Sequence, residues 1–117
     1  MKDYKFEFEF DGKNYALVFN LNVMEAIQKQ YGTVQKWGKL TDNKGGKEPN
    51  AKALIFGFTE MINEAIEIEN DEKGTNKPLF NTKQVGRLIT RVGVQESAKK
   101  LNKVITESVK DDHPKNI

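Results

Sequence analysis

Residues 4–19 read YKFEFEFDGKNYALVF and decide the fold. Aromatic and charged side chains alternate over residues 4–10, so a strand here places the aromatic rings on one face and the charges on the other. Asp11-Gly12 follows, and this pair readily adopts the positive φ angles of a tight hairpin turn. The second strand, 13–19, is apolar on both faces and is expected to be the more deeply buried. The stretch predicts an antiparallel β-hairpin.

Helical periodicity continues through the rest of the chain. A lone hairpin is only marginally stable, so helices are expected to cover its aromatic face. The predicted helices span residues 22–31, 34–40, 51–68, 82–92 and 94–110. Together the elements predict an α+β fold, with the hairpin packed against four to five helices in a single domain of residues 1–110. The polar, proline-containing tail 111–117 is expected to fray.

Cap residues mark the helix ends. Asn22 is expected to cap the first helix, with Glu25 reaching back to it. Asn81 and Gln84 form a capping box for the fourth helix, and Gly93 ends it. The last helix is expected to bury one stripe of side chains. They are Val94, Ala98, Leu101, Val104 or Ile105, and Ser108 or Val109.

Composition removes several kinds of chemistry. The 117 residues include no cysteine, which excludes cysteine nucleophiles, iron–sulfur clusters and cysteine-based zinc sites. One histidine, His113, is too few for a histidine-based metal site. Gly45-Gly46-Lys47 is similar to part of a phosphate-binding loop, but the first glycine of the motif is missing and Glu48 stands where the motif needs Ser or Thr. We expect no catalytic residues, no cofactor, no metal and no enzyme activity.

The chain shows no targeting or membrane signal. Its first residues lead into the alternating stretch rather than into an apolar run, and no window approaches the roughly 20 apolar residues of a membrane span. The sequence therefore predicts a cytoplasmic protein that does not contact the membrane.

Charge is unevenly distributed behind a net value of +2. One run of carboxylates consists of Glu60, Glu64, Glu67, Glu69, Asp71 and Glu72. This run is interpreted either as a solvated helix face or as a contact surface for a basic partner. A basic run farther along consists of Lys83, Arg87, Arg91, Lys99, Lys100 and Lys103, with Glu96 as its one acid.

The basic helix pair, 82–109, raises the alternative of a small nucleic-acid-binding regulator. A helix, a Val-Gly turn and a second helix with excess lysine and arginine are typical of a helix-turn-helix. Aligning Gly93 with the turn glycine of that motif, however, puts Lys99 and Asn102 at positions that should be buried and apolar. Nucleic acid is therefore the less favoured partner.

A resemblance to a known family rests on several features together. They are the run FNLNVME at 19–25, an Ile-x-x-x-Tyr-Gly helix end at 27–32, an apolar middle helix and a C-terminal helix pair. Over about residues 4–110 the chain resembles the tail assembly chaperones of long-tailed, siphovirus-like bacteriophages and of prophages in Gram-positive bacteria. The resemblance implies a non-enzymatic protein of the host cytoplasm that binds the tape measure protein and helps tail-tube subunits polymerise. It carries over no site residue.

Candidate partner-binding residues come from residue type and position. Trp37 is interpreted either as a lid over the core or as an exposed partner anchor, because tryptophan is enriched at binding hot spots. Met24 and the polar loop 41–50 are further candidates. In the charged runs the candidates are Glu64, Glu67, Arg87 and Arg91. An open edge of the hairpin offers a surface for self-association.

Overall fold

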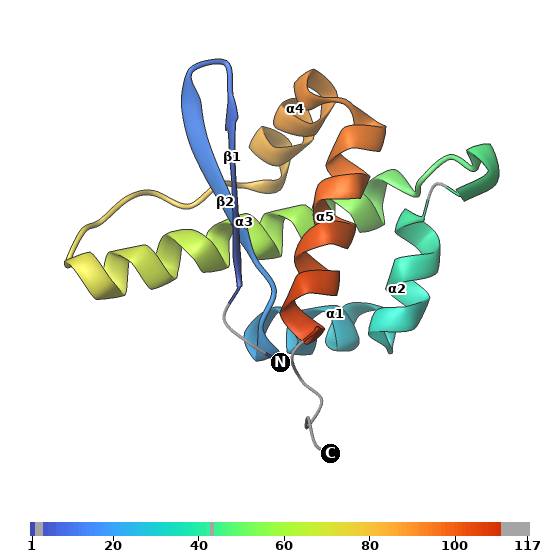
Figure 1. Cartoon of the computed structure of the whole chain (residues 1–117), viewed down its shortest axis with the longest axis horizontal. Helices are drawn as coiled ribbons and strands as arrows, with labels where there is room; N and C mark the ends of the chain where they lie inside the picture. The colour runs from blue at the N-terminus through green and yellow to red at the C-terminus, as the bar shows by residue number, and fades with distance from the viewer. Residues whose placement is uncertain (2–3, 43, 111–117) are drawn as a thin grey trace.

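A β-hairpin lies across a long central helix, and shorter helices pack around both (Figure 1). The computed structural model describes residue 1 and residues 4–42 and 44–110, so the predicted tail, 111–117, lies outside the described residues. Within them the elements follow in the order β1 (Lys5–Phe10), β2 (Lys13–Val18), α1 (Leu21–Tyr31), α2 (Val34–Thr41), the short 3-10 helix η1 (Lys44–Gly46), α3 (Ala51–Lys73), α4 (Thr82–Val92) and α5 (Val94–Val109). The predicted α+β fold, a hairpin with helices packed on it, is confirmed.

The hairpin forms as its sequence predicts. Asp11 and Gly12 have φ angles of 55° and 77°, which matches a tight two-residue turn. On the aromatic face, Phe8 stacks on Tyr15 with ring centroids 5.4 Å apart and meets Phe58 of α3 edge-on at 6.4 Å. Helices therefore cover the aromatic face of the hairpin, as expected for a sheet of only two strands.

The central helix α3 is longer than its apolar pattern predicts. The prediction ended it at Ile68, but it continues to Lys73 and ends at Gly74, whose φ of 66° is left-handed. Lys73 lies in the last turn, where a cation favours the helix C-terminus. These residues offset the unfavourable carboxylates of the last turns, so the acidic segment is helical and projects beyond the hairpin (Figure 1).

The predicted cap of α1 is wrong by two residues. Asn20 is the N-cap, and its side-chain oxygen accepts a hydrogen bond from the Val23 amide at 3.2 Å. Asn22 instead donates its side-chain amide to Glu64 at 3.0 Å. The capping box of α4 is confirmed, since Asn81 and Gln84 each accept the other's backbone amide hydrogen at 2.8 Å.

Trp37 is a core residue and not a surface anchor. Its side chain is 1% exposed, and its Nε1 donates a hydrogen bond to the Ala53 carbonyl oxygen at 2.9 Å. Gly57 of α3 makes room for it, because a Cβ at Gly57 would lie 2.9 Å from the Trp37 Cε2. The interpretation of Trp37 as a lid over the core is confirmed, and its interpretation as a partner anchor is wrong, because burial leaves no surface to bind.

Helix α5 packs in nearly the predicted phase. Of the two pairs of alternatives in the predicted buried stripe, Val104 is buried rather than Ile105, and Ser108 rather than Val109. The prediction that Val94 is buried is wrong, since this first residue of α5 is 44% exposed. Lys99 and Asn102 are exposed, because they lie outside the apolar stripe of α5. A helix-turn-helix would require both positions to be buried.

Candidate functional site

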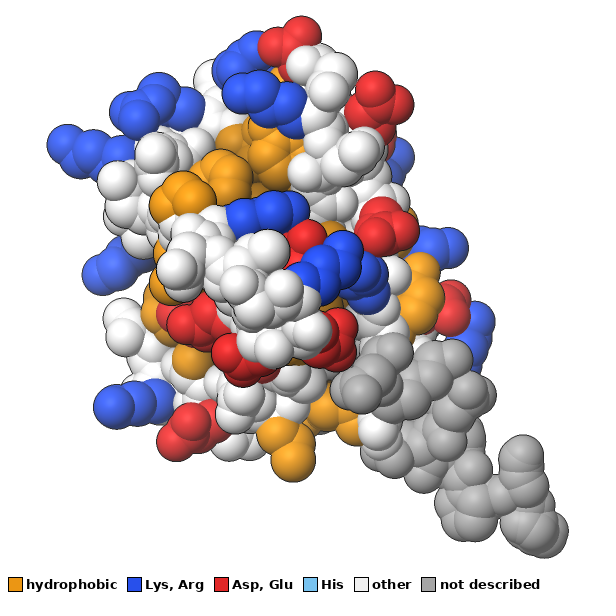
Figure 2. Space-filling view, turned by 90° about the vertical axis from the view of Figure 1, so that its left-hand side faces the viewer, with side chains coloured by type: hydrophobic (Ala, Val, Ile, Leu, Met, Phe, Trp, Pro, Cys, Tyr) orange, Lys and Arg blue, Asp and Glu red, His pale blue; other side chains and the backbone are white. Residues whose placement is uncertain are grey.

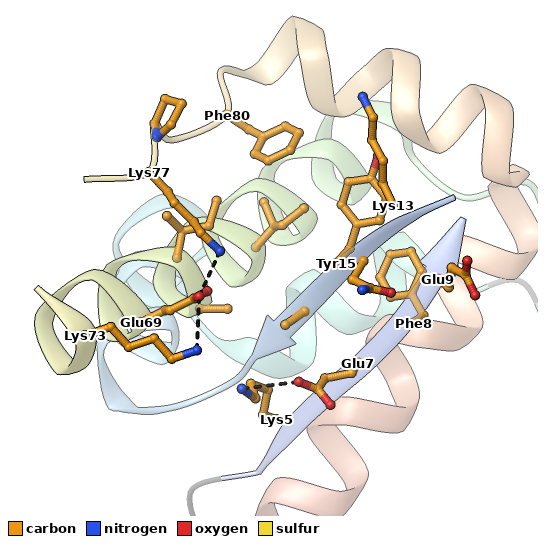
Figure 3. Close-up of a pocket in the computed structure, with 16 residues that line it drawn as sticks. Lys5, Glu7, Phe8, Glu9, Lys13, Tyr15, Glu69, Lys73, Lys77 and Phe80 are labelled. Carbon is orange, nitrogen blue, oxygen red and sulfur yellow. Dashed lines mark hydrogen bonds and ion pairs between the residues drawn. The ribbon is translucent and has the colours of Figure 1, made fainter. Parts of the chain in front are cut away.

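A groove of about 1010 Å³ lies between the hairpin and the second half of α3 (Figure 3). The chain segment 77–80, which follows α3, closes its far side. Apolar side chains form much of its lining, and Figure 2 shows hydrophobic side chains exposed in a hollow above the charged end of α3. The apolar residues that line the groove are Phe8, Tyr15, Ala16, Ile62, Ala65, Ile66, Pro78 and Phe80.

The edge of β2 that borders the groove has unused backbone groups. In a hairpin closed by a two-residue turn, the flanking residues Phe10 and Lys13 form a hydrogen-bonded pair, and the pairs alternate from there. Asn14 and Ala16 therefore direct their N–H and C=O groups away from β1. Neither residue forms a further backbone hydrogen bond within the described part of the chain. The edge of β2 is open toward the groove.

The two edges of the hairpin differ in chemistry. On the face opposite the aromatics, β1 carries Lys5, Glu7 and Glu9, whereas β2 carries Asn14, Ala16 and the buried Val18. Charged side chains on an edge strand discourage pairing with another chain, and β2 has none at these positions. The hairpin is therefore protected at β1 and accessible at β2.

The far wall of the groove is held in place by side chains of α3. Asn63 binds the backbone of Phe80 twice, donating to its carbonyl oxygen at 2.9 Å and accepting from its amide at 2.8 Å. Glu69 accepts hydrogen bonds from Lys77 at 2.8 Å and from Lys73 at 3.5 Å, and the hydrogen bond from Lys77 is the main cause of its lowered pKa. These contacts fix the position of the far wall of the groove.

Three comparisons with known proteins, against family models, curated proteins and solved structures, find no match to this chain. A function must therefore be argued from the groove itself. Within residues 1, 4–42 and 44–110 no three acidic or histidine side chains gather into a possible metal site. No helix in this part of the chain is both long enough and apolar enough to cross a membrane.

The acidic candidates are not gathered into one free surface. Glu64 accepts hydrogen bonds from Asn20 at 2.8 Å and from Asn22 at 3.0 Å, so it ties α3 to the start of α1. Glu67 is exposed. Partial burial, with the nearby charges of Glu64 and Glu67, raises the pKa of Glu60. Glu64 is therefore a structural residue, and the carboxylates near it repel one another.

The basic candidates divide in a similar way. Arg91 forms an ion pair with Asp11 at 2.7 Å and lies over the Phe10 ring, 5.6 Å from its centroid. Lys100 lies over the Phe8 ring at 5.0 Å. Arg87 is exposed and has no ion pair with a described residue. Arg91 and Lys100 thus hold the hairpin against α4 and α5.

None of the predicted partner-binding residues lines the groove. Met24 is half-buried and packs against the core, which leaves it little exposed surface. The sequence signal that pointed toward the groove was the open hairpin edge, which was interpreted as a surface for self-association. What sequence reasoning missed is the second wall, because Ile66, Lys77 and Phe80 come next to β2 only in the folded chain.

Proposed function

We propose that this protein is a non-enzymatic tail assembly chaperone of a phage or prophage, which binds its client, the tape measure protein, in the groove beside β2. The client name comes from the family resemblance, and the binding mode comes from the groove. One observation carries the proposal: the open edge of β2 at Asn14 and Ala16 lies beside a groove whose lining is partly apolar and partly charged. The role is exercised in the host cytoplasm and assists tail-tube assembly.

Strand addition explains how such a groove holds a client. An extended segment beside β2 forms main-chain hydrogen bonds with Asn14 and Ala16, which give affinity for many sequences. Its alternate side chains meet the apolar lining, including Tyr15 and Phe80, which favours apolar segments. Segments of this kind aggregate when they are exposed, so a chaperone that covers them keeps a long client soluble.

The charged side chains of the groove support binding rather than catalysis. Lys5 pairs with Glu7 at 3.3 Å, and Glu69 lies between Lys73 and Lys77. The hydrogen bond from Lys77 lowers the pKa of Glu69, and a carboxylate with a lowered pKa is a poor general base.

The alternative, a nucleic-acid-binding regulator that uses residues 82–109, receives less support. Arg91 and Lys100 face the hairpin, and Lys99 lies 3.7 Å from Glu96 in an exposed ion pair. Partners within the protein reduce the positive charge available to phosphates.

The test is co-expression with the tape measure protein encoded by the same phage or prophage. Ala16→Pro removes the outward N–H of β2 while leaving its hydrogen bonds to β1. Ala16→Ser keeps this outward N–H and adds no charge, so it is the matched control at the same position. We expect the wild type and Ala16→Ser to keep the client soluble and to co-purify with it, and Ala16→Pro to lose both.

Folding of each variant is checked by circular dichroism. If Ala16→Pro does not fold, Ala16→Lys places on β2 the kind of charge that protects β1 and is expected to have the same effect. Undiminished co-purification with Ala16→Lys would refute the groove as the binding site. Lack of client binding by the wild type, together with a shift of duplex DNA in a gel assay, would instead favour the regulator.

A further inference from the structure

A second hollow, of about 440 Å³, lies at the other end of α3 from the groove. Three helices form it: α1 contributes Tyr31, α3 contributes Ile55 and Phe56, and α4 contributes Gly86. Tyr31 and Phe56 meet edge-on, with ring centroids 5.6 Å apart, so their relative positions are fixed by packing. The hollow is mainly apolar and shares no lining residue with the groove.

The charges at this hollow are all of one sign. Its charged lining residues are Lys52 and Lys83, both exposed, and neither forms an ion pair with a described residue. Lys83 lies in the first turn of α4, where the helix dipole adds further positive potential. By contrast, Lys73 and Lys77 at the groove are paired with Glu69. An apolar hollow between two unpaired lysines favours an apolar group flanked by negative charge.

Gly86 keeps this hollow open. It lies inside α4 without a positive φ angle, so its backbone would accept any residue, and glycine there costs about 1 kcal/mol relative to alanine. A Cβ at Gly86 would lie 3.4 Å from the Cδ1 of Ile55, which also lines the hollow. A Cβ at Gly57 would overlap Trp37, whereas a Cβ at Gly86 would make only an ordinary contact with Ile55, so packing alone does not require glycine at position 86.

We propose that this hollow docks an amphipathic helix of a partner protein, which inserts a bulky apolar residue between Lys52 and Lys83 and carries Asp or Glu on either side of it. A helix fits better than an extended segment because the lining comes from helices and offers no open strand edge. Recognition then depends on side chains, as in helix-in-groove binding. The occupant is acidic because charge complementarity with two unpaired lysines steers and orients it.

The proposal is tested with two synthetic helical peptides of about 18 residues. They share one pattern of leucines, and the flanking residues are Glu in one peptide and Lys in the other. In fluorescence anisotropy we expect the Glu peptide to bind the wild type at least about tenfold more tightly than the Lys peptide. The double variant Lys52→Glu/Lys83→Glu is expected to reverse this preference.

Two variants separate the hollow from general charge effects. Lys39→Glu/Lys103→Glu makes the same change of net charge at exposed positions that do not line the hollow, and it is expected to bind the Glu peptide as the wild type does. Gly86→Met places a flexible side chain of high helix propensity in the hollow, so it is expected to keep the fold and weaken binding of the Glu peptide about tenfold or more.

Equal affinity for the two peptides would overturn the proposal, as would unchanged binding of the Glu peptide by both Lys52→Glu/Lys83→Glu and Gly86→Met. Analytical ultracentrifugation adds a further arm. If the wild type alone forms oligomers that Lys52→Glu/Lys83→Glu abolishes, the occupant is a second copy of this chain and the proposal is wrong. These measurements use no tape measure protein, so their outcome is independent of the groove and of the proposed function.

Discussion

Gly57→Ala is expected to destabilise this protein even though alanine is the better helix former. Gly57 is buried in the middle of α3, where an added Cβ would lie 2.9 Å from the Cε2 and 3.1 Å from the Nε1 of Trp37. The indole cannot move freely, because it is 1% exposed and its Nε1 is bound to the Ala53 carbonyl oxygen. Either the indole or the helix must shift.

The magnitude follows from comparing the two responses. Driving the indole into solvent would expose about 150–250 Å² of apolar surface, which costs about 4–6 kcal/mol at about 25 cal/mol per Å². Local displacement is cheaper, at about 1–3 kcal/mol for overpacking and about 1 kcal/mol for a weakened buried hydrogen bond. Alanine returns about 1 kcal/mol through helix propensity. We expect a net loss of about 2–3 kcal/mol, because the overlap at Gly57 is severe.

Urea unfolding measures this loss, followed by circular dichroism and by the fluorescence of the single tryptophan. The matched control is Gly38→Ala in α2, where an added Cβ has no neighbour within 4 Å. That variant is expected to gain about 0.5–1 kcal/mol. Combining Gly57→Ala with Trp37→Phe should recover part of the loss in a double-mutant cycle. If Gly57→Ala is as stable as the wild type with unchanged tryptophan emission, the packing argument is wrong.

Two further predictions concern groups whose pKa is raised. The Tyr31 hydroxyl is buried, which raises its pKa, and it has no hydrogen-bond partner among the described residues. Tyr31→Phe is therefore expected to leave the free energy of unfolding unchanged or to raise it by about 1 kcal/mol. A decrease in the free energy of unfolding by more than about 1 kcal/mol would reveal a hydrogen-bond partner and contradict this prediction. The folded state holds the Glu60 proton more tightly than the unfolded chain does, so ionisation lowers stability once the pH rises above the ordinary value of 4.5. At neutral pH, Glu60→Gln is expected to raise the free energy of unfolding by no more than about 0.5 kcal/mol, after allowance for solvent screening. Near pH 3, where Glu60 is protonated in both states, the substitution is expected to have no such effect. An increase in stability seen only at low pH would contradict the prediction.

The sequence correctly predicted those elements whose ends are set by residues close by in the sequence. Alternation and Asp11-Gly12 define the hairpin, and Asn81 with Gln84 defines the start of α4. The cap of α1 could not be chosen in this way, because Asn20 and Asn22 are both good caps. The choice depends on the distant residue Glu64, which accepts hydrogen bonds from both side chains.

The end of α3 shows the same limit. The apolar pattern placed its predicted end at Ile68, and the carboxylates near this end oppose the helix dipole. In the structure Lys77 folds back from beyond the helix onto Glu69, and Asn70 accepts the Lys77 amide at 3.0 Å. These contacts stabilise the final turns, but they require Lys77 to return, which no local pattern indicates.

Residue type alone could not locate the candidate binding surfaces. Trp37 was prominent because tryptophan is common at interfaces, yet the same large apolar area makes it valuable in a core. The groove depends instead on ordinary residues of β2, α3 and segment 77–80 that meet only after folding. The open edge of the hairpin could be predicted, but not which of the two edges it is.

The contacts of the hairpin also explain why its open edge suits binding. Helix α3 packs against β2, and the aromatic face of β1 is held by Arg91 over Phe10 and by Lys100 over Phe8. A hairpin alone is marginally stable, so these contacts reduce its conformational freedom before any client arrives. In the proposed strand addition, a client strand would lose only its own freedom on binding, because the edge it meets is already ordered. Two of the basic residues that first indicated a nucleic-acid surface, Arg91 and Lys100, thus contact the hairpin on which the proposed strand addition depends.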